Sequence, residues 1–416
     1  MSAVPASDPP ARASAARRRP RLVDRVVEAA AAGLLALTLV LLLAGCVARY
    51  GLRASVPWLD DAVAASFLWA VMLGALIAVR RHEHLRLSAV VDRLPARWRA
   101  PVTTLGEVAS LACLAMLAPA ATRYAVDDWA LRSPALDLPG SFRAAALAVG
   151  FVGMVAVVLA RLRRRARVRD VVASAAVIGT GVLLAGAALR ALPALPTELS
   201  VVPVLAVSFG LIALGVPIAF GFASAVVAYL ACLPAAPVVV AIGRIDEGMS
   251  ALLLVAVPAF VLLGRLMDTT GMGRAIVAVL AAGVGHLRAG MSHVLLVALF
   301  IVSGISGSKV SDMATVAPAL FPAMRRRGDD PGRMVALLAT GAAMAETVPP
   351  SITLIVLGSI AGVSIAKLFD VGMAVAVLLL VLLMVAAHGQ AGPGAAPGAG
   401  ARAASPRRRA PWRRIG

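Results

Sequence analysis

The amino-acid sequence predicts an all-α, polytopic membrane protein with about ten hydrophobic segments, including a re-entrant hairpin and a broken helix. Of its 416 residues, 61% are hydrophobic and only 15% are charged, which is more apolar side chain than a soluble domain can bury. The arginines occur in short runs between the apolar segments, such as ARRRPRLVDR and RLRRRARVR. The positive-inside rule produces this pattern. Because these runs contain no interleaved aromatic residues, we exclude nucleic acid as a partner despite the net charge of +19.

The first part of the chain is predicted to form a four-helix domain over residues 26–165. Residues 1–25 are rich in Ala, Pro and Arg, and are expected to form a disordered cytoplasmic N-terminus. Arginine-rich loops alternate with arginine-poor ones, which predicts a cytoplasmic N-terminus and places residues 126–141 in the periplasm. The expected spans cover about 26–48, 62–79, 104–124 and 142–160.

A fifth span, about 171–192, lies in the connecting segment 166–198, after which the pattern changes. Over 199–388 the apolar runs come closer together and are interrupted by Gly, Pro and Ser. These runs cover about 200–232, 249–267, 274–302, 334–362 and 368–387. Residues 389–416 have no apolar periodicity and are expected to be disordered. A GC-rich gene that is translated in the wrong reading frame gives such a Gly/Pro/Ala/Arg composition. We therefore expect this tail to result from a frameshift.

Several motifs occur in one order along the two parts. The first part carries FLWAVMLGALIAVRRHEHLRLSAVVDRLP (67–95). It resembles the small (DctQ-type) membrane subunit of the tripartite ATP-independent periplasmic (TRAP) transporters. The second part looks like the large (DctM-type) subunit of that family. It carries ALGVPIAFGFASA (213–225), VAVPAFVLLGRLMDTTGM (255–272), GHLRAGMSHV (285–294), SGISGSKVSDMATV (303–316) and VPPSITLIVLGSIAGVSIAKLF (348–369).

The resemblance implies a fused membrane component of a secondary transporter in the bacterial inner membrane. It would import an organic acid, a carboxylate or C4-dicarboxylate, by symport with sodium as the coupling ion and with no other cofactor. A periplasmic solute-binding protein would deliver the solute. The family's large subunit is built from two inverted repeats, and this chain is expected to contain only the first. The alternative is therefore a truncated, transport-inactive remnant that acts at most as a membrane scaffold.

Flexible and polar residues follow directly on an apolar run at Ser303. Non-helical backbone is tolerated at membrane depth only where it lines a cavity or is buried in protein. Gly304 and Gly307 permit the sharp turn of a hairpin tip, and Ser306 and Ser308 join Ser303 in supplying hydroxyls. Helix N-termini at such a tip attract a carboxylate, and free carbonyls are ligands for sodium.

Two charges follow the hairpin glycines. Asp312 lies three residues after Lys309, so the two side chains can pair on one helix face. The alternative is a small-residue helix-packing motif with Lys309 reaching to the membrane interface. Because glycine, serine and charge are concentrated together here, we favour the hairpin.

AETVPPSITLIVLG (345–358) predicts the second break. Pro349 and Pro350 remove amide donors and expose upstream carbonyls, while Thr347 and Ser351 add hydroxyls. A sodium ion is expected at Ser306, Ser308 and Ser351. The alternative is an ordinary proline kink. The usual family pattern has Ser, Thr, Gly and Pro before PPS, whereas this chain has GAAMAE (341–346) and lacks those hydroxyl groups. Glu346 is therefore either an ion ligand in their place or a residue at the membrane interface.

Other polar residues do not form a catalytic or metal site. His82 and His84 are two residues apart and face different sides of a helix. Asp127 and Asp128 are adjacent, so their side chains diverge into a periplasmic loop that is a candidate contact for the binding protein. With no nucleophile–base constellation and no phosphate-binding glycine loop, we expect no enzyme.

Overall fold

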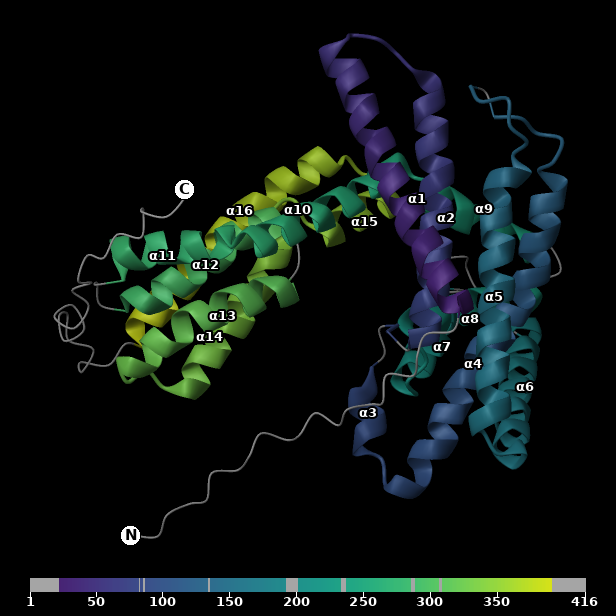
Figure 1. The fold of residues 1–416 in the computed structure, drawn as a ribbon. Helices are drawn as coiled ribbons and strands as arrows, with labels where there is room; N and C mark the ends of the chain where they lie inside the picture. The colour runs from purple at the N-terminus through teal and green to yellow at the C-terminus, as the bar shows by residue number, and fades with distance from the viewer. Residues whose placement is uncertain are drawn as a thin grey trace. The chain divides into compact units, whose positions relative to one another are not determined.

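The computed structural model describes residues 22–81, 83–84, 87–133, 135–191, 201–232, 237–285, 289–306 and 309–390. Over these residues the chain is helical, with an isolated β-bridge between Arg132 and Pro139 and no strand, so the all-α prediction is confirmed. The chain divides into two compact units, Met1–Ser250 and Ala251–Gly416 (Figure 1).

The first unit is organised around α4, which packs against α5, α6, α8 and α9, while α2 packs against α1 and α5. Leu68, Leu114 and Leu147, from α2, α4 and α5, are fully buried in its apolar core. Its helices are α1 (Leu22–Cys46), which continues as the π-helix η1 (Val47–Gly51), α2 (Pro57–Arg81), α3 (Ser88–Arg93), α4 (Ala96–Asp127), α5 (Ser141–Arg165), α6 (Val168–Ala191), α7 (Val201–Ala213), α8 (Ile218–Cys232) and α9 (Val239–Met249).

Small residues allow the helices of the first unit to approach closely. A Cβ atom added to Gly150 on α5 would clash with the methyl group of Met72 on α2. Such contacts through glycine are common between membrane helices.

The apolar run predicted over 200–232 forms two helices, because Gly215, with φ of +82°, and Pro217 form a turn between α7 and α8.

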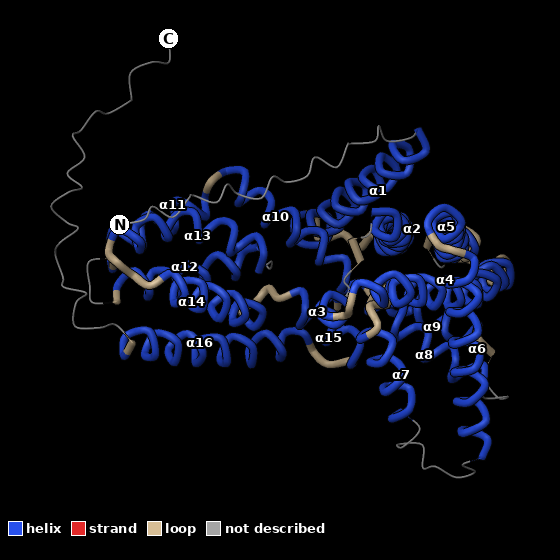
Figure 2. Tube along the Cα trace, turned by 90° about the horizontal axis from the view of Figure 1, so that it is seen from below, coloured by secondary structure: helices blue, strands red, loops and turns tan. Residues whose placement is uncertain are grey.

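The second unit is built around α12, which packs against α10, α11, α13, α14 and α16. Figure 2 shows α12, α14 and α16 running side by side. Leu295, Leu296 and Leu299 of α12 are fully buried. The helices are η2 (Leu252–Val255), α10 (Ala256–Thr270), α11 (Met272–Val284), α12 (Gly290–Ser306), α13 (Lys309–Arg326), α14 (Pro331–Met344), η3 (Ala345–Thr347), α15 (Ile352–Ala361) and α16 (Ile365–Gly389).

Five described helices are long and apolar enough to cross a membrane, and they occupy Leu22–Gly51, Pro57–Arg81, Ala96–Asp127, Ser141–Arg164 and Ile365–Gly389. A sixth candidate combines α9 with the following η2 and α10. The structure therefore gives five or six spans in its described residues, and the expected number of about ten is not confirmed. The reason is that several apolar runs form pairs of shorter helices, as at α7 and α8.

Candidate functional site

The predicted hairpin lies in the second unit, where α12 ends at Ser306 and α13 begins at Lys309. The two helices pack against each other. Gly307, Ser308 and the side chain of Ser306 lie outside the described part of the structure. The predicted turn at Gly307 and the predicted supply of hydroxyl groups by Ser306 and Ser308 therefore remain predictions.

A buried polar pair closes the base of this hairpin. Ser303 is 1% exposed and Asp312 is fully buried, and the Ser303 hydroxyl donates a hydrogen bond to the Asp312 carboxylate. A carboxylate removed from water needs such partners, because an unpaired buried charge is very costly. The pair therefore joins the last turns of α12 to the first turn of α13.

The predicted break lies between α14 and α15. The segment passes through the 3₁₀ turn η3 and a cis Pro349–Pro350 peptide before α15 begins. The Ser351 side chain is buried and caps α15 by accepting a hydrogen bond of 3.2 Å from the amide of Leu354. The Thr347 hydroxyl donates to the Met344 carbonyl at 2.7 Å.

The hairpin and the break lie against each other inside the second unit. A Cβ atom added to Gly304 would lie 3.4 Å from a methyl group of Val348 and 3.6 Å from the carbonyl oxygen of Pro349. A small residue at 304 therefore lets the end of α12 approach backbone that is outside helical hydrogen bonding. The described residues thus bring Ser303, Gly304 and Asp312 close to the break at Val348–Ser351.

An ion pair also connects the two segments. The Lys309 amine lies 2.5 Å from the Glu346 carboxylate, and the two side chains are 42% and 45% exposed. Helical spacing favoured Asp312 as the partner of Lys309. The structure instead shows a partner from η3, because Glu346 pairs with Lys309 at the start of α13. Whether Glu346 is an ion ligand or an interface residue remains a prediction.

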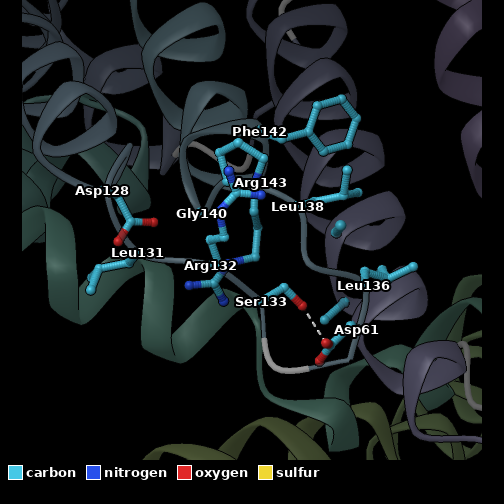
Figure 3. A pocket seen from close by; sticks show the side chains of 13 residues that line it. Asp61, Asp128, Leu131, Arg132, Ser133, Leu136, Leu138, Gly140, Phe142 and Arg143 are labelled. Carbon is cyan, nitrogen blue, oxygen red and sulfur yellow. Dashed lines mark hydrogen bonds between the residues drawn. The ribbon is translucent and has the colours of Figure 1, made fainter.

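A separate hollow occurs in the first unit, around the loop between α4 and α5 (Figure 3). It has a volume of about 310 Å³ and is lined by charged side chains including Asp61, Arg132 and Arg143. The Asp61 carboxylate accepts hydrogen bonds from the Ser133 hydroxyl and, at 3.3 Å, from the Ala135 amide. These bonds hold the loop against the start of α2.

Next to this hollow is a buried acid that the sequence analysis missed. Asp246 of α9 is 2% exposed and accepts hydrogen bonds from Arg143 of α5 at 2.7 Å and from Tyr124 of α4 at 2.8 Å. The Ser250 hydroxyl donates to the same carboxylate at 3.1 Å. Charged residues within apolar segments usually have partners, so an acid in the run VVAIGRIDEGM was the available signal.

The environment of Asp128, in the loop after α4, also reflects this cluster. Partial burial raises the pKa of its carboxyl group, the nearby Asp246 raises it further, and Arg143 acts in the opposite direction. Asp127, by contrast, is the last residue of α4. The two adjacent acids therefore have different surroundings.

Within the described residues there is no group of three or more His, Cys, Asp or Glu side chains that would hold a metal ion. The His84 ring lies 5.3 Å from the ring of Phe220, and His82 lies outside the described residues.

Comparison with known families identifies two segments. Residues 205–412, half of the chain, match the DctM component of the tripartite ATP-independent periplasmic transporters, and residues 38–168 match their DctQ component. α4 and α5 therefore lie in the DctQ-matching segment, and α9 lies in the DctM-matching segment.

Three curated relatives are TRAP transporter permease proteins. The isethionate TRAP transporter permease protein DctMQ of Oleidesulfovibrio alaskensis is 27% identical over 80% of this chain and 52% of the relative. The sialic acid TRAP transporter permease protein SiaT of Haemophilus influenzae is 24% identical over 83% of this chain and 58% of its own length. The 2,3-diketo-L-gulonate TRAP transporter large permease protein YiaN of Escherichia coli is 35% identical over 42% of this chain and 41% of its own length. The chain thus spans about half the length of these relatives.

Proposed function

Because the chain belongs to the TRAP transporter family and joins DctQ and DctM segments in one polypeptide, we propose that it serves in the bacterial inner membrane as a component that imports an organic acid with sodium. A periplasmic solute-binding protein delivers the acid. The named substrates of the three relatives, isethionate, sialic acid and 2,3-diketo-L-gulonate, are all organic acids.

The contact between the hairpin and the broken helix carries this proposal. Gly304 lies against the carbonyl of Pro349, so backbone oxygens outside helical hydrogen bonding lie near the hydroxyl–carboxylate pair of Ser303 and Asp312. Hard oxygen atoms of this kind are the ligands that transporters use for sodium at helix breaks. We assign the sodium ligands to this region, with Ser351 on the side of the break and Ser306 and Ser308 on the side of the hairpin.

Sodium binding by the purified full chain tests this assignment. We expect ²²Na⁺ to bind and to be displaced by unlabelled Na⁺ but not by K⁺. Losing an oxygen ligand in Ser351→Ala, or the negative charge near the site in Asp312→Asn, should weaken binding about tenfold, equivalent to about 1.4 kcal/mol.

The control is Ser208→Ala, which removes a buried hydroxyl from α7 that donates to Val204 at 2.8 Å within its own helix. It should leave sodium affinity unchanged. Equal affinities in all three variants would contradict the assigned site.

Uptake separates transport from the scaffold alternative. The full chain is reconstituted in liposomes with the solute-binding protein and a labelled organic acid, with and without an inward sodium gradient. Sodium-dependent accumulation is the expected result. Association with the binding protein without accumulation would favour the scaffold.

The proposed orientation makes a further prediction. The Ala135→Cys variant, in a chain with its three natural cysteines replaced by alanine, should react with a membrane-impermeant maleimide in intact spheroplasts, because residues 126–141 are proposed to face the periplasm. Ala135 is exposed. An Arg164→Cys variant, also at an exposed position, should react only after lysis. The opposite pattern would reverse the topology.

A further inference from the structure

The ion pair between Lys309 and Glu346 has an unusual cation for this protein. The chain has 40 basic residues, of which Lys309 and Lys367 are the two lysines and the rest are arginines. Elsewhere in the described residues arginine supplies the cation of ion pairs such as Arg143–Asp246 and Arg161–Glu107. Among the ion pairs of the described residues, the lysine at the start of α13 is therefore an exception, since arginine supplies the cation of the others.

The difference between the two cations is chemical. Arginine binds a carboxylate through a rigid, two-pronged fork, whereas lysine is a compact point charge on a flexible stem and exchanges partners easily. An ion pair that is nearly half exposed contributes little to stability, and the Lys309–Glu346 pair has that exposure. The pair is therefore poorly suited to holding the hairpin on the break, and well suited to opening.

The residues around the ion pair are much less exposed to solvent than the pair itself. Ser303, Asp312 and Ser351 are at most 3% exposed, whereas Lys309 and Glu346 are accessible at the rim of the same hairpin–break contact. A free carboxylate that reaches this rim meets an ammonium group already bound to a carboxylate. Because the incoming group has the same charge and chemistry as the carboxylate that it replaces, the exchange changes the free energy little.

We propose that Lys309 binds the carboxylate of the transported acid, and that Glu346 occupies this position in its absence. This inference rests on the proposed function, because it assumes that an organic acid enters the hairpin–break region. Glu346 acts as an internal competitor, which keeps Lys309 paired when no acid is bound and sets the concentration at which the acid displaces it.

Lysine-selective acetylation of the purified full chain tests the proposal, because peptide mass spectrometry separates Lys309 from Lys367. Lys367 lies on α16 and is exposed, so it is the internal control. The probes are the carboxylates succinate, sialic acid and 2,3-diketo-L-gulonate, with neutral succinamide as the uncharged control. At least one acid should slow acetylation of Lys309 and leave Lys367 unchanged, and succinamide should slow neither.

The Glu346→Gln variant sharpens the test. Removing a half-exposed ion pair should speed acetylation of Lys309 about two- to fivefold, and the protecting acid should then act at a correspondingly lower concentration. A Glu346→Gln variant that labels faster but gains no sensitivity to any acid would overturn the proposal and leave only an ionic contact.

Sodium binding, measured in parallel, separates this inference from the proposed function. If Glu346→Gln still binds ²²Na⁺ but no acid protects Lys309, the inference is wrong, whereas the proposed function is not contradicted. Protection of Lys309 without ²²Na⁺ binding supports the inference and counts against sodium coupling. Equal protection of Lys309 and Lys367 would show non-specific shielding and also defeat the inference.

Discussion

Replacing Arg143 with methionine is expected to lower the free energy of unfolding by about 3 kcal/mol, since it leaves the Asp246 carboxylate buried without a counter-charge. Asp246 would keep the Tyr124 and Ser250 hydroxyls as donors, but neither carries a positive charge. Unfolding in mixed micelles, followed by far-UV circular dichroism, measures the loss.

The matched control is Arg244→Met. Arg244 lies on the same helix as Asp246 and pairs with Glu247 at 2.8 Å, but both side chains are more than 70% exposed, so its loss should change stability by less than about 0.5 kcal/mol. The double variant Arg143→Met/Asp246→Asn should recover a large part of the loss, because the stranded charge is gone. Similar shifts for Arg143→Met and Arg244→Met would show that the burial of Asp246 gives its partner no special role in stability.

Replacing Gly341 with valine is expected to destabilise the protein by about 2 kcal/mol through overpacking. A Cβ atom at this position on α14 would lie 2.6 Å from a methyl group of Leu299 and 3.2 Å from one of Leu296. Both leucines are fully buried in α12, so they have little room to move. Because α14 leads directly into the break, the same change should speed acetylation of Lys309 by moving Glu346 away.

Gly283→Val is the control for this prediction. Gly283 lies on α11 and has no atom within 4 Å of the position that a Cβ would occupy, so valine there carries only the cost of helix propensity. The difference between the two variants isolates the clash with α12. If both variants unfold alike, the close approach of α14 and α12 is not a determinant of stability.

The sequence allowed the helical class and both interruptions in the second half to be predicted. Clustered glycine and serine marked the end of α12, and the PPS motif marked the start of α15, because these residues weaken or remove local helical hydrogen bonds. The number of spans was overestimated, since apolarity alone does not distinguish one long helix from two short ones. The turn at Gly215 and Pro217 depends on two residues inside an apolar run of more than 30.

Partners distant in sequence were not predictable in the same way. Asp312 was expected beside Lys309 because the two are three residues apart, yet Lys309 pairs with Glu346 and Asp312 accepts a hydrogen bond from Ser303. Tyr124 and Asp246 are separated by 122 positions, and no local pattern links them. Such contacts depend on which helices pack together, which the periodicity of a single sequence does not specify.

The packing of α4 against α8 and α9 bears on how genes of this kind can be divided. The border between the family segments falls between residues 168 and 205, whereas the compact units divide after Ser250. Encoding the two segments as separate polypeptides would put Arg143 on one product and Asp246 on the other. Each product would then present an unneutralised charge until it met its counterpart. Assembly would favour the matching partner, because association neutralises both charges.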